Sequence, residues 1–296
     1  MFEARALSVE NTTCDSVAVS IPTIGLQLYT LKTEFANDPF ATLREVAAMG
    51  FEGVEFVGNS LRSMDLEQLK TELSEDGLKV AGIAFEIEEL EGELDSILRL
   101  CYSIKCSTIV MPSIRRGDCQ SRSGLVTVAL KMNYIASRCK TEGIAFLYHT
   151  HGLELETVEG RTGMEWLSGS WNPQLVRLEI DTCWVDRAGI DAESFVKLYG
   201  NQCSSIHFKD VNANKREVEI GAGVIDMTGV AKEALRHGVE WFIVEQEECD
   251  GAPIDSVKVC FRNLTRIRNA VQINNARSNF RVAFARFVLH VFEMNG

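Results

Sequence analysis

The sequence predicts a single α/β domain folded as a (β/α)8 barrel. From residue 24 onward, short apolar or β-branched runs alternate with longer segments of helical apolar spacing. Several helical segments end on a glycine directly before the next strand, a residue that readily adopts the left-handed conformation that ends a helix; these are Gly50, Gly77, Gly143 and Gly238. Apolar runs such as STIVMP also lack polar alternation, which is typical of strands covered on both faces.

Eight strand segments can be counted along the chain, each followed by a segment with helical spacing. They are IGLQLYTL at 24–31, GVEFV at 53–57, VAGIAF at 80–85, TIVMP at 108–112, IAFLYHTH at 144–151, VRLEIDTCW at 176–184, SIHFKDV at 205–211 and WFIVEQE at 241–247. No linker rich in Pro, Gly or Ser interrupts them. Residues 22–272 are therefore predicted to form one barrel, with extensions at 1–21 and 273–296.

The two extensions have different patterns. Residues 273–296 combine apolar residues with Arg277, Arg281 and Arg286, which indicates one amphipathic helix. We expect it to pack on the barrel base or on a second subunit; a membrane-surface or poorly ordered tail is the alternative. Residues 1–21 lack the basic and apolar regions of a secretion signal, and no run of about 18 apolar residues predicts a membrane span.

Composition narrows the class of partner. The 296 residues carry a formal net charge of −12, which disfavours binding to nucleic acid, since that depends on Lys and Arg. Nine cysteines form no CxxC pair and are odd in number, so reduced thiols in a cytoplasmic protein are expected. A small neutral or weakly charged substrate fits this composition, with no nucleic-acid or membrane partner.

Ionisable residues gather at the predicted strand ends, where barrels of this kind carry their chemistry. They are Glu55, His149, His151, Asp181, His207, Lys209 and Glu245. Taken singly, each has an ordinary structural explanation, such as a hydrogen-bonded histidine, a helix cap or an ion pair. Their joint placement indicates a metal site, because imidazole and carboxylate together suit Mn²⁺, Co²⁺, Zn²⁺ or Fe²⁺.

Motifs around these residues resemble the xylose isomerase-like TIM barrel superfamily, in its sugar phosphate isomerase/epimerase branch. The resemblance covers roughly residues 24–270 and rests on IGLQLYTLK, GFEGVEFVG, GIAFLYHTHGLEL, LEIDTCWVDRAGID, IHFKD, IGAGVIDM and WFIVEQE, in the expected order. The fifth-strand motif is closest to a subgroup with HNHxxEF at this point. The broader superfamily includes tagatose 3-epimerase and inosose dehydratase.

The resemblance implies one divalent metal ion, with Mn²⁺ favoured over Co²⁺, Zn²⁺, Fe²⁺ or Mg²⁺. Relatives hold it with a Glu, Asp, His, Glu set, of which Asp181, His207 and Glu245 match the last three. The fourth ligand has two candidates, because His149 stands where many relatives have glutamate and Glu154 aligns with the glutamate of HNHxxEF. Ala222 and Glu247 also depart from common family residues, which leaves the substrate open.

The implied activity is isomerisation or epimerisation of a small keto sugar or sugar derivative through an enediolate. Glu245 and His149 are the candidate proton-transfer groups, and Lys209 is a third catalytic candidate that could polarise an oxygen or bind an anion. A salt bridge from Lys209 to Asp210 or Asp181 is the equal alternative. The substrate-binding candidates are His151, Trp184 and Glu55, and Tyr148 could add an apolar wall.

Three other functions stay open or are disfavoured. A lyase or dehydratase acting on a keto-polyol or 3-keto-glycoside by β-elimination would use the same enolate chemistry. A non-catalytic sugar-binding barrel is the second alternative, prompted by the altered fifth-strand motif. A DNA-repair endonuclease of the same superfamily is disfavoured by the acidic charge and by a total of five histidines. A homo-oligomer is expected only by analogy.

Overall fold

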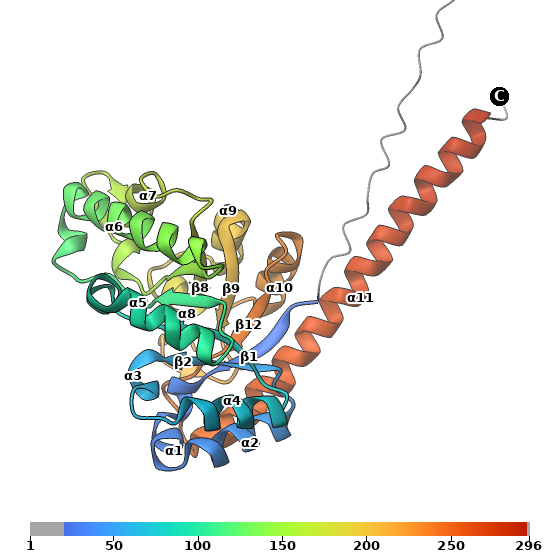
Figure 1. Cartoon of the computed structure of the whole chain (residues 1–296). Coiled ribbons are helices and arrows are strands. Elements are labelled where there is room, and N and C mark those ends of the chain that lie inside the picture. Colours follow the sequence, from blue (N-terminus) through green and yellow to red (C-terminus); the bar gives the residue numbers. More distant parts are fainter. Residues whose placement is uncertain (1–20, 295–296) are drawn as a thin grey trace, which may run out of the picture.

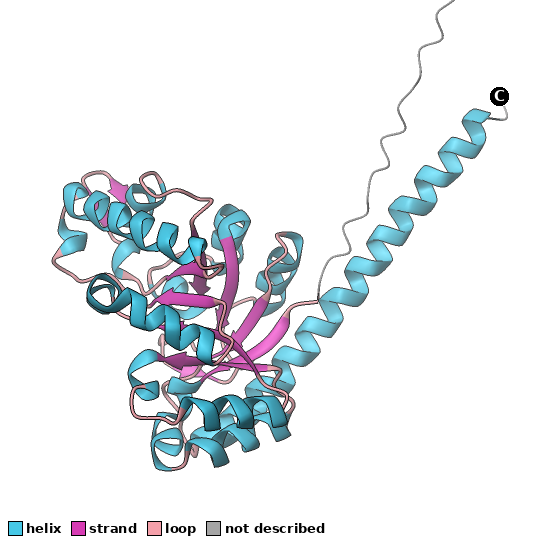
Figure 2. Ribbon diagram, in the orientation of Figure 1, coloured by secondary structure: helices cyan, strands magenta, loops and turns pink. Residues whose placement is uncertain are grey.

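A computed structural model describes residues 21–294 of the chain, with side chains as far as residue 274. Eight parallel strands alternate with helices that surround them (Figures 1 and 2). The barrel strands are β1 (Thr23–Gln27), β2 (Gly53–Val57), β3 (Lys79–Ala84), β4 (Thr108–Met111), β5 (Ala145–His149), β8 (Val176–Asp181), β9 (Cys203–Phe208) and β12 (Trp241–Val244). They close in the order β1-β12-β9-β8-β5-β4-β3-β2, which confirms the predicted (β/α)8 barrel.

The remaining elements are helices and short hairpins. The helices are α1 (Lys32–Asn37), α2 (Pro39–Met49), α3 (Gly58–Leu61), α4 (Leu66–Glu75), α5 (Ile87–Ser103), α6 (Arg122–Thr141), α7 (Gly163–Ser168), α8 (Thr182–Arg187), α9 (Ala192–Tyr199), α10 (Met227–Arg236) and α11 (Pro253–Met294). Single 3-10 turns are η1 (Leu28–Leu31), η2 (Asp118–Gln120), η3 (Leu153–Leu155) and η4 (Gly200–Gln202). Two hairpins pair β6 (Thr157–Val158) with β7 (Arg161–Thr162) and β10 (Asp210–Val211) with β11 (Glu217–Val218).

The amino end of the barrel is filled by Trp241 at the start of β12. Room for its indole comes from two glycines on neighbouring strands: a Cβ added to Gly53 would lie 2.6 Å from the Trp241 ring, and one added to Gly25 would lie 3.3 Å from it. Side chains alternate along a strand, so Glu245 points into the same barrel two layers above. The half-buried Trp241 thus packs at the opposite end of the barrel from the polar mouth.

Seven of the eight predicted strands are too long at their carboxyl ends, and two of them show the reason. The segment 24–31 leaves the sheet at Gln27, whose side chain accepts a hydrogen bond from the Tyr29 amide and starts the turn η1. The segment 176–184 likewise ends at Asp181, and Thr182 begins α8. Side chains that cap a helix compete with the sheet for the backbone, which a run of apolar residues does not reveal.

The carboxyl-terminal extension continues a helix of the barrel. Helix α11 runs without a break through Met294, and its carboxyl-terminal part projects away from the barrel (Figure 1). Residues 273–294 are therefore helical, but the predicted limits of the barrel domain and the amphipathic character of this extension stay predictions. The predicted amino-terminal extension lies outside the described residues, except for residue 21. No helix in the described part is long and apolar enough to cross a membrane.

We expect Gly53→Ala to lower the free energy of unfolding by about 1–3 kcal/mol, because the new methyl group would overpack against the Trp241 ring and the Lys79 carbonyl. The matched control is Gly92→Ala in α5, where no atom lies within 4 Å of the added Cβ. That control should gain up to about 1 kcal/mol from helix propensity. Urea unfolding followed by circular dichroism measures both; equal effects would contradict the packing at the base.

Candidate active site

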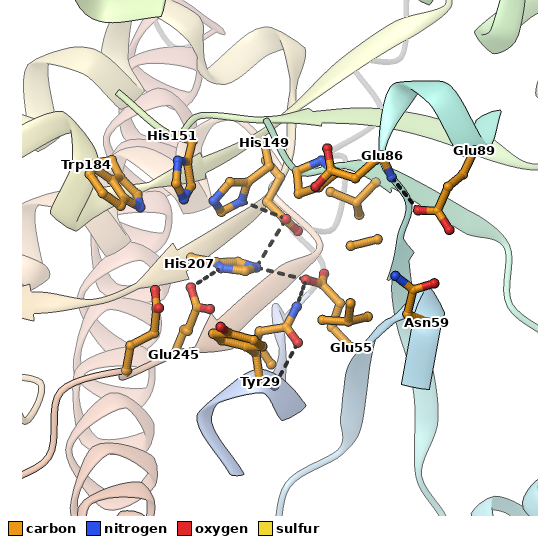
Figure 3. A pocket seen from close by; sticks show the side chains of 17 residues that line it. Tyr29, Glu55, Asn59, Glu86, Glu89, His149, His151, Trp184, His207 and Glu245 are labelled. Atoms are coloured by element: carbon orange, nitrogen blue, oxygen red, sulfur yellow. Dashed lines mark hydrogen bonds and ion pairs between the residues drawn. The ribbon is translucent and has the colours of Figure 1, made fainter. Parts of the chain in front are cut away.

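Strand register brings the ionisable residues into one ring inside the carboxyl end of the barrel. Gln27 pairs with Glu55, His149 with Glu179, and Asp181 with His207. All of these residues except Asp181 line a cavity of about 410 Å³ (Figure 3). It is lined by Gln27, Tyr29, Glu55, Val57, Asn59, Ala84, Glu86, Glu89, Val110, Pro112, His149, His151, Glu179, Trp184, His207, Glu245 and Glu247.

His207 lies at the centre of this ring. Its Nε2 is 3.2 Å from Glu55 Oε1 and 3.2 Å from Glu179 Oε2. On the other side of the ring, Nδ1 lies 3.0 Å from Glu245 Oε2 (Figure 3). Glu55 is held in turn by Gln27, whose Nε2 donates to its Oε1 over 2.5 Å. A single buried imidazole therefore contacts carboxylates from three other strands or strand ends.

His149 extends the cluster towards β8. Its Nδ1 hydrogen bonds with Glu179 Oε2 at 3.0 Å, and its Nε2 lies 3.9 Å from Asp181 Oδ2. The His149 and His207 ring centroids are 4.7 Å apart. Two sets of three side chains consequently have donor atoms close enough for one metal ion, the first being His149, Glu179 and His207, and the second Asp181, His207 and Glu245.

Asp181 uses only one of its two oxygens in a hydrogen bond. Oδ1 accepts a hydrogen bond of 3.0 Å from the Trp184 amide and caps α8. This is the helix-capping role that the sequence analysis gave as an ordinary explanation. Oδ2 is buried and has no hydrogen-bond partner. A buried carboxylate oxygen without a partner is costly, so a donor or a cation is expected there.

Lys209 is buried behind the cavity rather than in its lining. Its Nζ lies 2.6 Å from Glu247 Oε1, 3.3 Å from Glu217 Oε1 and 3.5 Å from Glu245 Oε2. The salt bridge foreseen as the alternative thus exists, with glutamates as partners in place of Asp210 or Asp181. Lys209 therefore affects the cavity through its contacts with Glu245 and Glu247, which both line it.

The remaining predicted residues fall in two groups. His151 lines the cavity and packs on Trp184, with ring centroids 4.3 Å apart. Glu154 is fully buried but lies outside the cavity lining and outside both metal-compatible sets found among the described residues. Its Oε1 accepts hydrogen bonds from the amides of His151 and Gly152, which holds the turn after β5. Tyr148 is buried in the core beside Trp171.

The sequence of the chain is similar to one known family of barrels. Residues 43–262 match the model of the xylose isomerase-like TIM barrel family. The chain belongs to this family. The family resemblance predicted from the motifs is thereby confirmed. Among curated proteins, no sequence matches the chain.

Several solved structures share the fold of this xylose isomerase-like barrel. A sugar phosphate isomerase/epimerase from Parabacteroides distasonis has a TM-score of 0.74 at 20% identity and covers 88% of this chain and 99% of its own. An L-ribulose 3-epimerase reaches a TM-score of 0.68 at 12% identity, with 87% and 98% covered. A probable 3-DHS dehydratase from Bacillus anthracis has the same TM-score at 15% identity, with 82% and 98% covered. At these identities the likeness shows the fold.

The charges of this family member's cavity are poorly balanced. Burial, with the neighbouring Glu179 carboxylate, raises the pKa of Glu55 to about 7. Burial alone would lower the pKa of His207, but Glu179 and Glu55 raise it well above its ordinary value. Although burial also opposes the charge on Glu179, His207 and His149 bring its pKa well below the ordinary range. The buried carboxylates therefore outnumber the buried imidazoles here. The carboxylates are those of Glu55, Glu179, Asp181 and Glu245, and the imidazoles are those of His149 and His207.

Two residues of the ring were missed by sequence reasoning. Glu179 and Gln27 both face the cavity, but only their strand partners were predicted as site residues. The available signal was alternation: Glu179 precedes Asp181 by two positions and so shares its face of the strand. Glu55, His149, His151, Asp181, His207 and Glu245 are brought together as expected.

We expect Lys209→Met to cost about 3–5 kcal/mol at pH 7.5, because it leaves buried carboxylates without their cation. Burial raises the pKa of Glu245, but Lys209 and then His207 bring it below the ordinary value. In the wild type this contribution is complete above the unfolded pKa, so it stays constant between pH 7.5 and pH 5. In the variant burial acts without Lys209 and raises the pKa of the carboxyls it leaves behind. They take up protons as pH falls, so the deficit of the variant should shrink towards pH 5.

The measurement is urea unfolding of chelator-treated protein at pH 7.5 and at pH 5. Lys70→Met is the matched control, since Lys70 lies on the surface of α4 and contacts Glu67 at 3.5 Å. Its stability should change by no more than about 0.5 kcal/mol. Equal deficits of Lys209→Met at both pH values would contradict the charge account.

Proposed function

We propose that the chain is a divalent-metal-dependent isomerase or epimerase of a small keto sugar or sugar derivative. The observation that carries the proposal is the buried ring of imidazoles and carboxylates at the carboxyl end of the barrel, inside a cavity of about 410 Å³. In barrels of this fold the carboxyl end is where catalytic sites lie. Membership of the xylose isomerase-like family agrees with this assignment.

The residues present fit a divalent cation. Glu55, Glu179 and Glu245 are buried in the cavity lining, and Asp181 is buried close to His207 and Glu245. The buried cation Lys209 is already shared among Glu217, Glu245 and Glu247. The unpartnered Asp181 Oδ2 adds a free ligand oxygen. Uncompensated buried charge is expensive, and a cation would neutralise it. We assign the ion to His149, Asp181, His207 and Glu245. These nitrogen and oxygen ligands suit several divalent metals, and Mn²⁺ is favoured among them on the family resemblance.

The proposed reaction moves a proton at a carbon beside a carbonyl. When bound, the metal supplies Lewis-acid polarisation of the substrate oxygens. Glu245 then acts as the proton acceptor on one side of the substrate. His149 is the candidate donor on the other side, and it can transfer a proton only while its Nε2 is off the metal, because its Nδ1 is bound to Glu179. Lys209 keeps Glu245 ionised and in place through its contact of 3.5 Å, so we assign it a positioning role. The intermediate would be an enediolate of the sugar.

In this proposal, two walls of the cavity orient the substrate. His151 and Trp184 offer stacked rings on one side of the mouth. Ala84 and Val110 line an apolar side formed by β3 and β4. Glu55, held by Gln27, faces the hydroxyl groups. A sugar ring combines an apolar face with polar edges, which matches such a lining.

A lyase acting by β-elimination on a keto-polyol or 3-keto-glycoside is the second candidate. The observation that favours it is the chemical inequality of the proposed proton-transfer pair, an imidazole and a carboxylate. After the same proton abstraction, a proton donor on one face suits departure of a hydroxyl or alkoxide group. A solved structure that shares the fold is named a probable dehydratase, which agrees with this alternative.

Metal content tests the site. Protein purified without chelator should hold close to one divalent ion per chain by elemental analysis, and Asp181→Asn should bind it more than about 100-fold more weakly, beyond the usual effect of an outer-shell change. The histidine variant His207→Ala tests the same site. Its matched control is His237→Ala, because His237 at the end of α10 hydrogen bonds with Asn201 away from the cavity. A wild-type barrel that stays metal-free after loading would leave only a sugar-binding role.

The identity of the fourth ligand has its own test. His149→Ala should lower metal affinity, whereas Glu154→Gln should retain it, since Glu154 lies outside the cavity lining and binds the amides of His151 and Gly152. Isothermal titration with Mn²⁺ measures both variants. The reverse order of affinities would assign the ligand to Glu154.

Chemistry is tested by incubating the loaded protein with keto sugars and keto-polyols in D₂O. Proton abstraction incorporates deuterium beside the carbonyl, and nuclear magnetic resonance of the products separates an epimer from an unsaturated ketone. Glu245→Gln should abolish the exchange. Metal binding without exchange on any substrate, in wild type as in the variant, would favour the non-catalytic barrel.

A further inference from the structure

Glu179 touches both histidines of the ring through one oxygen atom. Its Oε2 lies 3.0 Å from His149 Nδ1 and 3.2 Å from His207 Nε2. Its other oxygen, Oε1, accepts a short hydrogen bond from the Ser205 hydroxyl on the next strand. The side chain is only 1% exposed. Glu179 is therefore clamped from one side and presents a fixed acceptor to two imidazoles.

The two histidines use opposite ring nitrogens towards Glu179. His149 offers Nδ1 and His207 offers Nε2, so the nitrogens left over are His149 Nε2 and His207 Nδ1. Those remaining nitrogens face the other proposed ligands: His149 Nε2 is 3.9 Å from Asp181 Oδ2, and His207 Nδ1 is 3.0 Å from Glu245 Oε2. Neutral imidazole carries its proton on one nitrogen, so an acceptor on one side leaves a lone pair on the other.

We propose that Glu179 is a positioning residue that sets the tautomers of both histidines, so that His149 Nε2 and His207 Nδ1 present lone pairs to a divalent metal. The inference rests on the proposed metal site and assigns Glu179 an outer role in it. A carboxylate that accepts the second ring N–H of a metal-binding histidine orients the ring and raises its basicity. Here one carboxylate on β8 serves two rings, on the two strands β5 and β9 that flank it.

The surroundings favour this role over direct binding by Glu179. As an ionised carboxylate it has acceptor oxygens only, and both are hydrogen bonded, Oε1 to Ser205 and Oε2 to His149. His207 Nε2 lies 3.2 Å from the same Oε2 without a hydrogen-bond partner, and the proposed role gives it one. Asp181 differs, because its Oδ2 is buried without a hydrogen-bond partner. Glu55 also lies 3.2 Å from His207 Nε2, but it makes no contact of this kind with His149 in the described structure. Among the described residues, Glu179 is the one with a carboxylate oxygen within 3.2 Å of both histidines.

The first experiment reads the tautomers in the intact wild-type chain. Protein labelled with ¹⁵N and loaded with Zn²⁺ is observed by long-range imidazole correlation spectra, with His237 as the internal reference for a histidine outside the site. The expected pattern is a protonated Nδ1 on His149 and a protonated Nε2 on His207. The opposite pattern on either ring would overturn the inference, whether or not any variant folds.

The second experiment measures affinity for the metal alone. Isothermal titration of Glu179→Gln with Zn²⁺ and Mn²⁺ should show binding about 10–100-fold weaker than wild type, the usual effect of losing an outer-shell partner. Glu233→Gln is the matched control, since Glu233 is a buried glutamate of α10 that contacts Arg236 and lies outside the cavity. Ser205→Ala, which removes the clamp on Oε1, should give a smaller loss in the same direction.

The outcomes separate this inference from the proposed function. If Glu179→Gln binds metal as tightly as wild type and Glu233→Gln, the metal site stands and the role of Glu179 is refuted. If wild type itself binds neither metal, the proposed function fails and the inference fails with it. Weaker binding in Glu179→Gln together with a changed tautomer pattern supports both.

Discussion

Parallel register inside a closed barrel is the constraint on which this site depends. Because side chains alternate along each strand and neighbouring strands are staggered, the inward residues of β5, β8 and β9 meet at one height. Glu179 is thereby placed beside His149, and Asp181 beside His207. No flexible loop is needed to assemble the ring. The loops after the strands instead add its walls, with Trp184 and His151 contributed from α8 and the turn after β5.

The ring has an energetic cost that the rest of the barrel offsets. Buried carboxylates oppose one another, and each stays ionised only where an imidazole, Lys209 or a bound cation faces it. Opposite the ring, Ala84, Val110 and Leu147 form a small apolar cluster inside the barrel. The main core, between the sheet and the helices, is a separate and much larger cluster. Most of the apolar packing therefore lies between the sheet and the helices. The polar half of the barrel interior forms the candidate site.

The fold and most of the site were predictable from the sequence, for a physical reason. Strands covered on both faces are continuous apolar runs, so His207 and Asp181 at their ends are conspicuous. Glu179 and Gln27 were not recognised, because a polar residue within a strand does not show whether it faces the barrel interior. Only register shows that Glu179 meets two histidines. Strand ends were predicted too far at Leu28 and Thr182, where side-chain caps start new turns.

Trp241 and the two glycines beside it form a coupled set at the amino end of the barrel. The indole occupies space that side chains at Gly25 and Gly53 would need, so a larger residue at either glycine requires a smaller one at position 241. Sequence change at this end of the barrel is therefore expected to occur in compensating pairs.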